Sequence, residues 1–124
     1  MVARRVIVSA SLLTLLIAGG ACGEGGGDIE GDAVARGEVL FTSNCVVCHG
    51  EQAMGNPNGP PLVHELYAAD SYSDEEFRTA VNEGVPQRHW DAGAMPSMRG
   101  LSDEQIDDII AYVHEKQREA GLID

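Results

Sequence analysis

Two cysteines and a histidine in one short segment carry the most specific chemistry of this chain. Cys45 and Cys48 are separated by two residues, and His49 follows directly. Thiols at this spacing can each add to a vinyl group of one haem, and the next histidine is then placed to bind the iron from the same side. The segment therefore predicts covalent attachment of one c-type haem through Cys45 and Cys48, with His49 as an iron ligand.

Two other kinds of site share the C-x-x-C spacing. A thioredoxin-like redox pair should follow a strand in a βαβ unit, and no such pattern surrounds Cys45. A zinc site would need two further ligands, normally a second close pair of Cys or His. The other histidines, His64, His89 and His114, are scattered singly. A redox dithiol and a metal site stay as the alternatives to haem attachment.

Length and composition limit the fold to one small domain. The chain has 124 residues, of which aromatic residues make up 5%. A domain of this size has a thin hydrophobic core if it relies on side chains alone. A buried macrocycle would supply the missing apolar volume, as metals and disulfides do in other small proteins.

The charge of the chain is strongly acidic. All 20 Asp and Glu residues follow position 21, and only six of the eight Lys and Arg residues do, which gives −14 from Cys22 onward. Nucleic acid and anionic membrane surfaces would repel such a protein, so no nucleic-acid partner is expected. We expect redox partner proteins with basic docking patches, because complementary charge raises encounter rates. The charge also serves solubility, which is the alternative interpretation.

The N-terminal segment has the layout of a secretory signal. Arg4 and Arg5 precede an apolar run over residues 6–18, followed by small residues up to position 21. This run is shorter than the roughly 20 residues that span a membrane as a helix, so an uncleaved anchor is the weaker interpretation. Residues 1–21 are therefore predicted to be a signal peptide, and the protein is predicted to be exported.

Cys22 directly follows this segment and resembles the lipid-accepting cysteine of bacterial lipoproteins. Gly19 departs from that pattern, because such signals usually carry Leu three positions before the cysteine. The alternatives are ordinary cleavage nearby, which leaves a free thiol, and retention of the segment. Acyl chains at Cys22 would anchor the protein to the extracytoplasmic face of the cell membrane. Without them it would be periplasmic.

The remainder divides into a tether and a helical domain. Residues 22–31 are rich in glycine and acids and predict a flexible tether. A domain over residues 32–124 follows, and it opens with a helix that ends near Ser43. Gly37 lies in the middle of this helix, where glycine usually permits close approach of another backbone.

Two capping boxes predict the later helices: Ser73 with Glu76, and Ser102 with Gln105. The second helix carries an apolar stripe that consists of Ile106, Ile109, Ile110 and Val113. The segments between are predicted as a loop over 50–59, a short apolar helical patch over 62–67 that carries His64, and an irregular stretch over 85–100.

The order of these elements resembles a class I cytochrome c. The chain shows a helix, C-V-V-C-H-G, a loop with G-P-P-L, a middle helix, a loop with M-P, and a terminal helix. The resemblance covers Asp32 to about Gln117. It implies an all-α, small cytochrome c fold of three to five helices around one covalent haem. It also implies that the first and last helices cross near Gly37 and Tyr112.

The resemblance further implies the iron ligands and cofactor contacts. His49 would be the proximal ligand, with its other ring nitrogen bonded to the Pro60 carbonyl, and Met95 of the M-P loop would be the distal ligand. Leu62 and Trp90 would contact the haem. The cationic and N–H groups of Arg88, His89 and Trp90 would suit a place near the haem propionates, and an exposed loop is the alternative interpretation of these three residues. Met98 and Met54 are the alternatives to Met95, and the single histidines His64, His89 and His114 offer bis-histidine ligation as a further alternative.

Six-coordinate iron favours a one-electron carrier that cycles between Fe(III) and Fe(II) and works between extracytoplasmic redox partners. Two protein ligands leave no position for a substrate, so no enzymatic activity is expected. The alternatives are a haem subunit of a dehydrogenase or oxidase complex, and a peroxidase or gas binder with a labile sixth ligand. Rapid binding of carbon monoxide to the reduced protein would separate the last class from a carrier.

Overall fold

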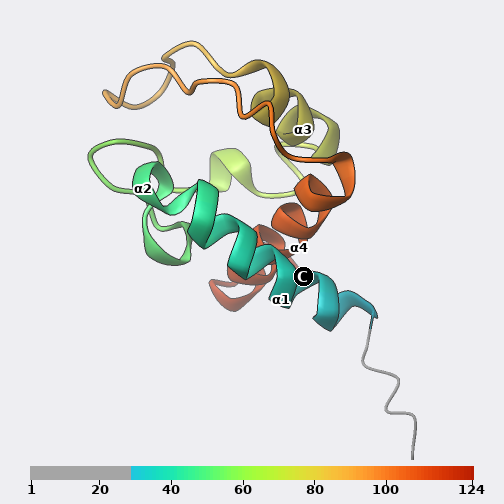
Figure 1. Cartoon of the computed structure of the whole chain (residues 1–124). Coiled ribbons are helices and arrows are strands. Elements are labelled where there is room, and N and C mark those ends of the chain that lie inside the picture. The colour runs from blue at the N-terminus through green and yellow to red at the C-terminus, as the bar shows by residue number, and fades with distance from the viewer. Residues whose placement is uncertain (1–28) are drawn as a thin grey trace, which may run out of the picture.

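The fold is known from a computed structural model that describes residues 29–124. The predicted signal peptide, Cys22 and the tether up to residue 28 lie outside the described residues. The described part contains four α-helices and no strand, which confirms the all-α prediction (Figure 1). The helices are α1 (Ile29–Asn44), α2 (Val46–His49), α3 (Asp74–Glu83) and α4 (Asp103–Glu119), with 3-10 turns η1 (Glu51–Ala53) and η2 (Glu65–Tyr67). None of the described helices has the length and apolar content needed to cross a membrane.

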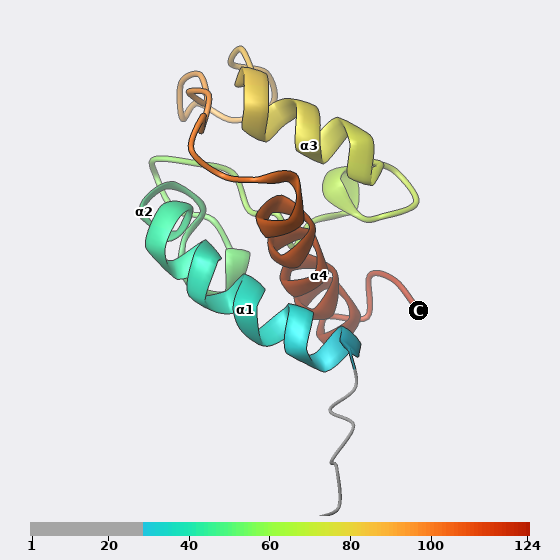
Figure 2. The same ribbon diagram turned by 45° about the vertical axis from the view of Figure 1, so that its right-hand side comes forward.

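The first and last helices, α1 and α4, pack directly against each other (Figure 2). A Cβ atom at Gly37 would collide with the backbone oxygen of Asp108 and lie 2.9 Å from Cβ of Tyr112. One turn along α1, the rings of Phe41 and Tyr112 have centroids 5.3 Å apart. Arg36 donates to both carboxylate oxygens of Asp108 at 2.7 Å. The crossing therefore lies where the resemblance implied it.

We expect Gly37→Ala to destabilise the protein although alanine is the better helix former. Overpacking of a tight contact costs about 1–3 kcal/mol, which exceeds the roughly 1 kcal/mol that alanine gains over glycine in a helix. Denaturant unfolding of the haem-loaded protein measures the net loss. Gly100→Ala is the matched control, because a Cβ atom there meets nothing within 4 Å. Equal stability of the two variants would contradict a close helix contact.

Both predicted capping boxes are present. Ser73 accepts a hydrogen bond from the backbone of Glu76, whose side chain bonds back to Ser73, and so α3 begins at the next residue. Ser102 and Gln105 do the same for α4. The predicted apolar stripe of α4 is fully buried: Ile106, Ile109, Ile110 and Val113. Local capping and helical periodicity together determine these two helices.

The buried side chains form two clusters, and the 84–100 segment runs across the end of the molecule beside α3 (Figure 2). In the larger cluster, Phe41 of α1 packs with Tyr112 of α4 and with Leu62 from the connecting loop. In the smaller one, Val81 of α3 packs against Ile106 of α4. Residues from both clusters line the cavity described below, so the cavity joins the two parts of the core.

Three local predictions differ from the structure. Helix α1 begins at Ile29, so the last residues of the predicted tether are helical. The helical patch predicted over 62–67 contains only the short 3-10 turn η2. The prediction that His64 lies on a helix is wrong. His64 precedes η2 with an extended backbone, and its Nδ1 accepts a hydrogen bond from the Leu66 N–H. Short segments of this kind depend on tertiary contacts, which periodicity does not report.

Candidate haem site

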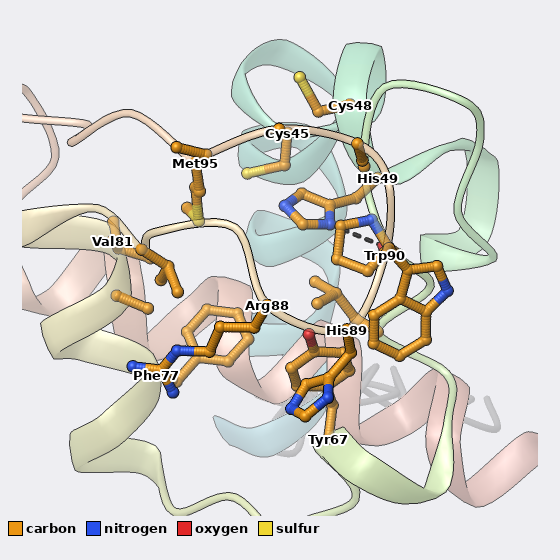
Figure 3. A pocket seen from close by; sticks show the side chains of 18 of the residues that line it. Cys45, Cys48, His49, Tyr67, Phe77, Val81, Arg88, His89, Trp90 and Met95 are labelled. Atoms are coloured by element: carbon orange, nitrogen blue, oxygen red, sulfur yellow. Dashed lines mark hydrogen bonds between the residues drawn. The ribbon is translucent and has the colours of Figure 1, made fainter.

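All residues predicted to contact haem line one cavity (Figure 3). These residues are Cys45, Cys48, His49, Pro60, Leu62, Trp90 and Met95. They come from α2, from the loop that follows it, and from the 84–100 segment, which are far apart in the sequence. In Figure 3 the His49 ring and the Met95 side chain lie on different sides of the same space.

Helix α2 presents the two thiols and the imidazole. Cys45 precedes α2, and its N–H donates to the Phe41 carbonyl at 2.7 Å, which joins the motif to the end of α1. The His49 N–H donates to the Cys45 carbonyl at 2.8 Å and closes one helical turn. This turn brings Cys45, Cys48 and His49 to the same cavity, as attachment and ligation from one segment require.

The loop after α2 holds that helix in place. The amide groups of Asn56 and Asn58 donate to the Val47 carbonyl at 3.0 and 3.4 Å. The backbone of Gly59 passes so close to α2 that a Cβ atom there would lie 2.5 Å from the Cys48 carbonyl oxygen. The sequence pattern predicts an irregular loop here and does not indicate these contacts. The signal that could have identified them is the repeated Asn and Gly directly before Pro60.

His49 is oriented by a single hydrogen bond. Its Nδ1 lies 2.9 Å from the Pro60 carbonyl oxygen, which can only accept, so Nδ1 carries the proton and Nε2 keeps its lone pair. Only 7% of the residue is exposed. Burial lowers the pKa of His49, and the bond to Pro60 opposes this in part. A neutral imidazole with a fixed tautomer is the form that binds metals.

Met95 is fixed by backbone contacts to the end of α3. It forms a two-way bridge with Val85, with N–H to carbonyl distances of 2.9 and 2.8 Å. Gly84 has φ of +81°, and a Cβ atom there would lie 2.6 Å from the Met95 carbonyl oxygen. Glycine is therefore needed before the bridge, both for its backbone angle and for the space that it leaves.

The alternative ligands occupy different places. Met98 packs with Met95 against the Val81 cluster but does not line the cavity. Met54 is 60% exposed. Of the three single histidines, only His89 is among the cavity-lining residues, and its side chain is exposed. His114 lies on α4 with Nε2 3.5 Å from the Asp74 carboxylate.

Aromatic side chains build one wall of the cavity. The Trp90 ring stacks on Tyr67 with centroids 5.6 Å apart and an interplanar angle of 27°. His64 meets Trp90 edge-on at 5.2 Å. Arg88 also lines the cavity. The sequence pattern places Tyr67 in an apolar patch and does not indicate its role in this wall, because the contact joins segments that are distant in sequence.

The donor set fits a haem better than the other two sites. Residues 29–124 contain no strand, so the thiols do not follow a strand of a βαβ unit as a thioredoxin-like pair does, and burial raises the pKa of the Cys45 thiol to about 11. Within residues 29–124 no three His, Cys, Asp or Glu side chains gather into a metal-binding group, as zinc would need. Two thiols, one neutral imidazole and one thioether around an apolar cavity match covalent haem with two iron ligands.

Comparisons with known proteins agree with this chemistry. The family model described as Cytochrome c matches residues 34–117. The chain is 30% identical over 114 residues to cytochrome c6 of Synechocystis sp., which covers 90% of this chain and 88% of that protein. It is 33% identical over 81 residues to cytochrome c6 of Cyanidioschyzon merolae, which covers 64% and 71%.

A second group of relatives is longer. The chain is 33% identical over 88 residues to the Cbb3-type cytochrome c oxidase subunit FixP of Bradyrhizobium sp. (strain ORS 278), which covers 68% of this chain but only 28% of the subunit. The comparison with solved structures gave no match. The chain is thus a class I, mono-haem member of the cytochrome c family, with a covalently bound haem c as its cofactor.

Proposed function

We propose that this protein is a one-electron carrier whose haem iron is held between His49 and Met95. The observation that carries the proposal is that both side chains line one cavity and are fixed separately, His49 through Pro60 and Met95 through Val85. With both ligands bound, no coordination position is open to a substrate. The protein is accordingly proposed to transfer electrons and not to be an enzyme.

Each residue of the cavity has a proposed task. Cys45 and Cys48 would hold the haem covalently, and Leu62 and Trp90 would pack against it. When bound, the haem supplies a one-electron Fe(III)/Fe(II) couple. The bond from His49 to the Pro60 carbonyl makes the imidazole a better electron donor. The soft thioether of Met95 favours ferrous iron and so raises the reduction potential.

Rigid ligands favour fast electron transfer. The backbone bridge at Met95 and the turn at His49 would hold the two ligands in place when the iron changes oxidation state, so little rearrangement would accompany each transfer. The apolar residues of the cavity wall would keep water from a bound haem, which would also limit solvent rearrangement. Both effects arise from this protein's own residues, and they favour an electron carrier over a catalyst.

The relatives support two candidate settings. Similarity to a cytochrome c6 over 88% of its length supports a free-standing carrier. Similarity to a Cbb3-type oxidase subunit, although over 28% of that subunit, favours a second candidate, in which this chain is a haem subunit that passes electrons within an oxidase complex. Both settings use the same ligands and the same couple.

Exposure of the reduced protein to carbon monoxide tests the carrier proposal. We expect one electron per chain in a reductive titration, and slow, incomplete formation of the carbon monoxide adduct because Met95 blocks the sixth position. Myoglobin, whose ferrous iron is open, serves as the positive control for the assay. Adduct formation as fast as in that control would refute the carrier and favour a gas binder or peroxidase.

The acidic charge supports the choice of partner. Outside the predicted signal, six cations face 20 acids, and the described ion pairs involve four of those cations: Arg36, Arg78, Lys116 and Arg118. The remaining excess of negative charge would attract redox proteins with basic docking patches and raise the encounter rate. No nucleic-acid partner is proposed for a surface of this sign.

The segment before the domain supports export and anchorage. We assign residues 1–21 to a signal peptide, Cys22 to lipid attachment, and the glycine-rich residues that follow to a tether for the cytochrome c domain. The domain would then work at the extracytoplasmic face of the cell membrane. Two acyl signals at Cys22 are enough for stable membrane binding, whereas one chain alone is marginal.

Fractionation of cells that express wild type and Cys22→Ser tests the anchor. Wild type should sediment with membranes, and Cys22→Ser should escape processing by the lipoprotein signal peptidase and keep its full length. The control is Cys48→Ser. This variant loses a thiol of the domain but keeps Cys22, so it should still sediment with membranes. A mature wild-type protein that begins elsewhere and stays entirely in the soluble fraction would overturn the assignment.

A further inference from the structure

One buried amide connects α4 to the cavity wall opposite α2. Gln117 is fully buried in the last turns of α4, between Lys116 and Arg118, which are partly exposed. Its Nε2 donates to the Leu62 carbonyl at 2.9 Å and to the Tyr67 carbonyl at 2.7 Å. Leu62 and Tyr67 both line the cavity. A single side chain thus holds both ends of the segment from Leu62 to Tyr67.

The two ends of that segment are held very differently. At the first end, the N–H groups of Leu62 and Val63 donate to the Ala53 carbonyl at 2.8 and 3.1 Å. At the second end, the Tyr67 N–H donates only locally, to the His64 carbonyl at 2.9 Å. Among the hydrogen bonds of the described residues, the bond from Gln117 is the one that ties the Tyr67 backbone to a helix.

Tyr67 in turn supports the segment that carries Met95. Its ring stacks on Trp90, and Tyr72 meets it edge-on with centroids 5.5 Å apart. Trp90 lies in the loop between Val85 and Met95, whose ends are joined by the two-way backbone bridge. Contacts therefore run from Gln117 through the Tyr67 backbone and ring to the middle of the loop that ends at Met95.

We propose that Gln117 is a positioning residue, which holds Tyr67 and through it the Trp90 loop against the cofactor cavity. The inference rests on the proposed function for its importance, because the loop ends at the proposed iron ligand. Only the donor half of the amide is used, since Oε1 is buried without a partner among residues 29–124. A buried acceptor left unpaired is unfavourable. The burial of this side chain is therefore explained by the two carbonyls that its Nε2 binds, and not by its own Oε1.

Gln117→Met separates the donor function from packing, because methionine keeps the length of the side chain and lacks the amide. In the haem-loaded protein we expect the Tyr67 amide to exchange its hydrogen about 10-fold or more faster, since the carbonyls of Leu62 and Tyr67 lose their buried donor. Amides of Ile109 and Ile110 in α4 should exchange at wild-type rates. Gln117→Asn keeps the amide on a shorter side chain and should give a smaller change in the same direction. It serves as the test if Gln117→Met folds poorly.

Tryptophan emission gives an independent measure of the loop. Trp90 is the only tryptophan of the chain. Haem quenches a nearby indole, so a less firmly held Trp90 should emit more strongly in Gln117→Met than in wild type. Lys116→Met is the matched control, because the neighbouring Lys116 Nζ pairs with Glu119 and lies over the Tyr112 ring, and so makes a different set of contacts; the variant should leave both measurements unchanged.

Two results would overturn the inference. One is uniform acceleration of exchange in α1, α4 and at Tyr67, which would make Gln117 a general packing residue. The other is unchanged Tyr67 exchange and Trp90 emission. Failure of the electron-carrier proposal is seen separately, as rapid binding of carbon monoxide by wild type, and does not alter either measurement on Gln117.

Discussion

Replacement of both Cys45 and Cys48 by serine is expected to abolish covalent haem completely. A serine hydroxyl does not form the thioether bond that a thiol forms with a haem vinyl group, and both thiols line the cavity beside His49. The protein should be exported by a host with a haem-attachment system and run on a denaturing gel. Wild type should carry a haem-peroxidase stain at the position of the polypeptide, and the double variant should show background stain with normal export.

Val47→Ser is the control for this experiment. Val47 lies between the two cysteines but is 73% exposed, so a serine there changes the same segment without a cavity contact. It should keep the stain at wild-type intensity. A colourless wild type from a maturation-competent host would rule out covalent haem, and a stained double variant would move the attachment to other residues.

Met95→Ala is expected to change the iron centre more than any other single substitution outside α2. Wild type should show the weak long-wavelength band of sulfur bound to ferric iron, and the variant should lose it. Removal of the thioether destabilises ferrous iron, so the reduction potential should fall by on the order of 100 mV, within the roughly 0.8 V that axial ligands span. The reduced variant should also bind carbon monoxide rapidly.

Met98→Ala separates ligation from packing. Met98 lies in the same segment and packs with Met95 against Val81 and its neighbours. Its loss should lower the free energy of unfolding by about 2 kcal/mol, the lower end for a partly buried methionine, and leave the band and the potential nearly unchanged. If the two variants behave the other way round, Met98 is the ligand and the carrier proposal survives. If neither affects the band, the sulfur comes from another residue, and Met54 is the remaining alternative; if wild type lacks the band, the sixth ligand is not a methionine.

The elements that could be predicted from the sequence are those with a local cause. Ser73 and Ser102 each supply a capping side chain, and the residues after Ser102 repeat at helical spacing, so α3 and α4 follow from short-range rules. The close contact at Gly37 was predictable because a glycine inside a helix is unfavourable unless it makes room. In each case the residues that determine the local structure lie in one short stretch of the sequence.

The parts that could not be predicted depend on distant contacts. The segment from Leu62 to Tyr67 looked helical, but its carbonyls are bound by Gln117, 50 or more residues later, and so it forms only η2. Trp90 was assigned to the haem propionates, and the structure adds its stacking on Tyr67. Gln117 itself looks like an ordinary polar residue near a helix end, and the one local signal of its burial is its position four residues after Val113, on the apolar stripe of α4.

The pairing of α1 with α4 also affects the order of events during synthesis. Arg36 and Asp108, which join the two helices, are 72 positions apart. Closing so long a loop is costly before the contacts form, and a chain grows from its N-terminus. The cysteines of α2 are therefore made long before α4 exists to complete the core around them. The pairing of α1 with α4, and with it the larger cluster of the core, forms only when the chain is nearly complete.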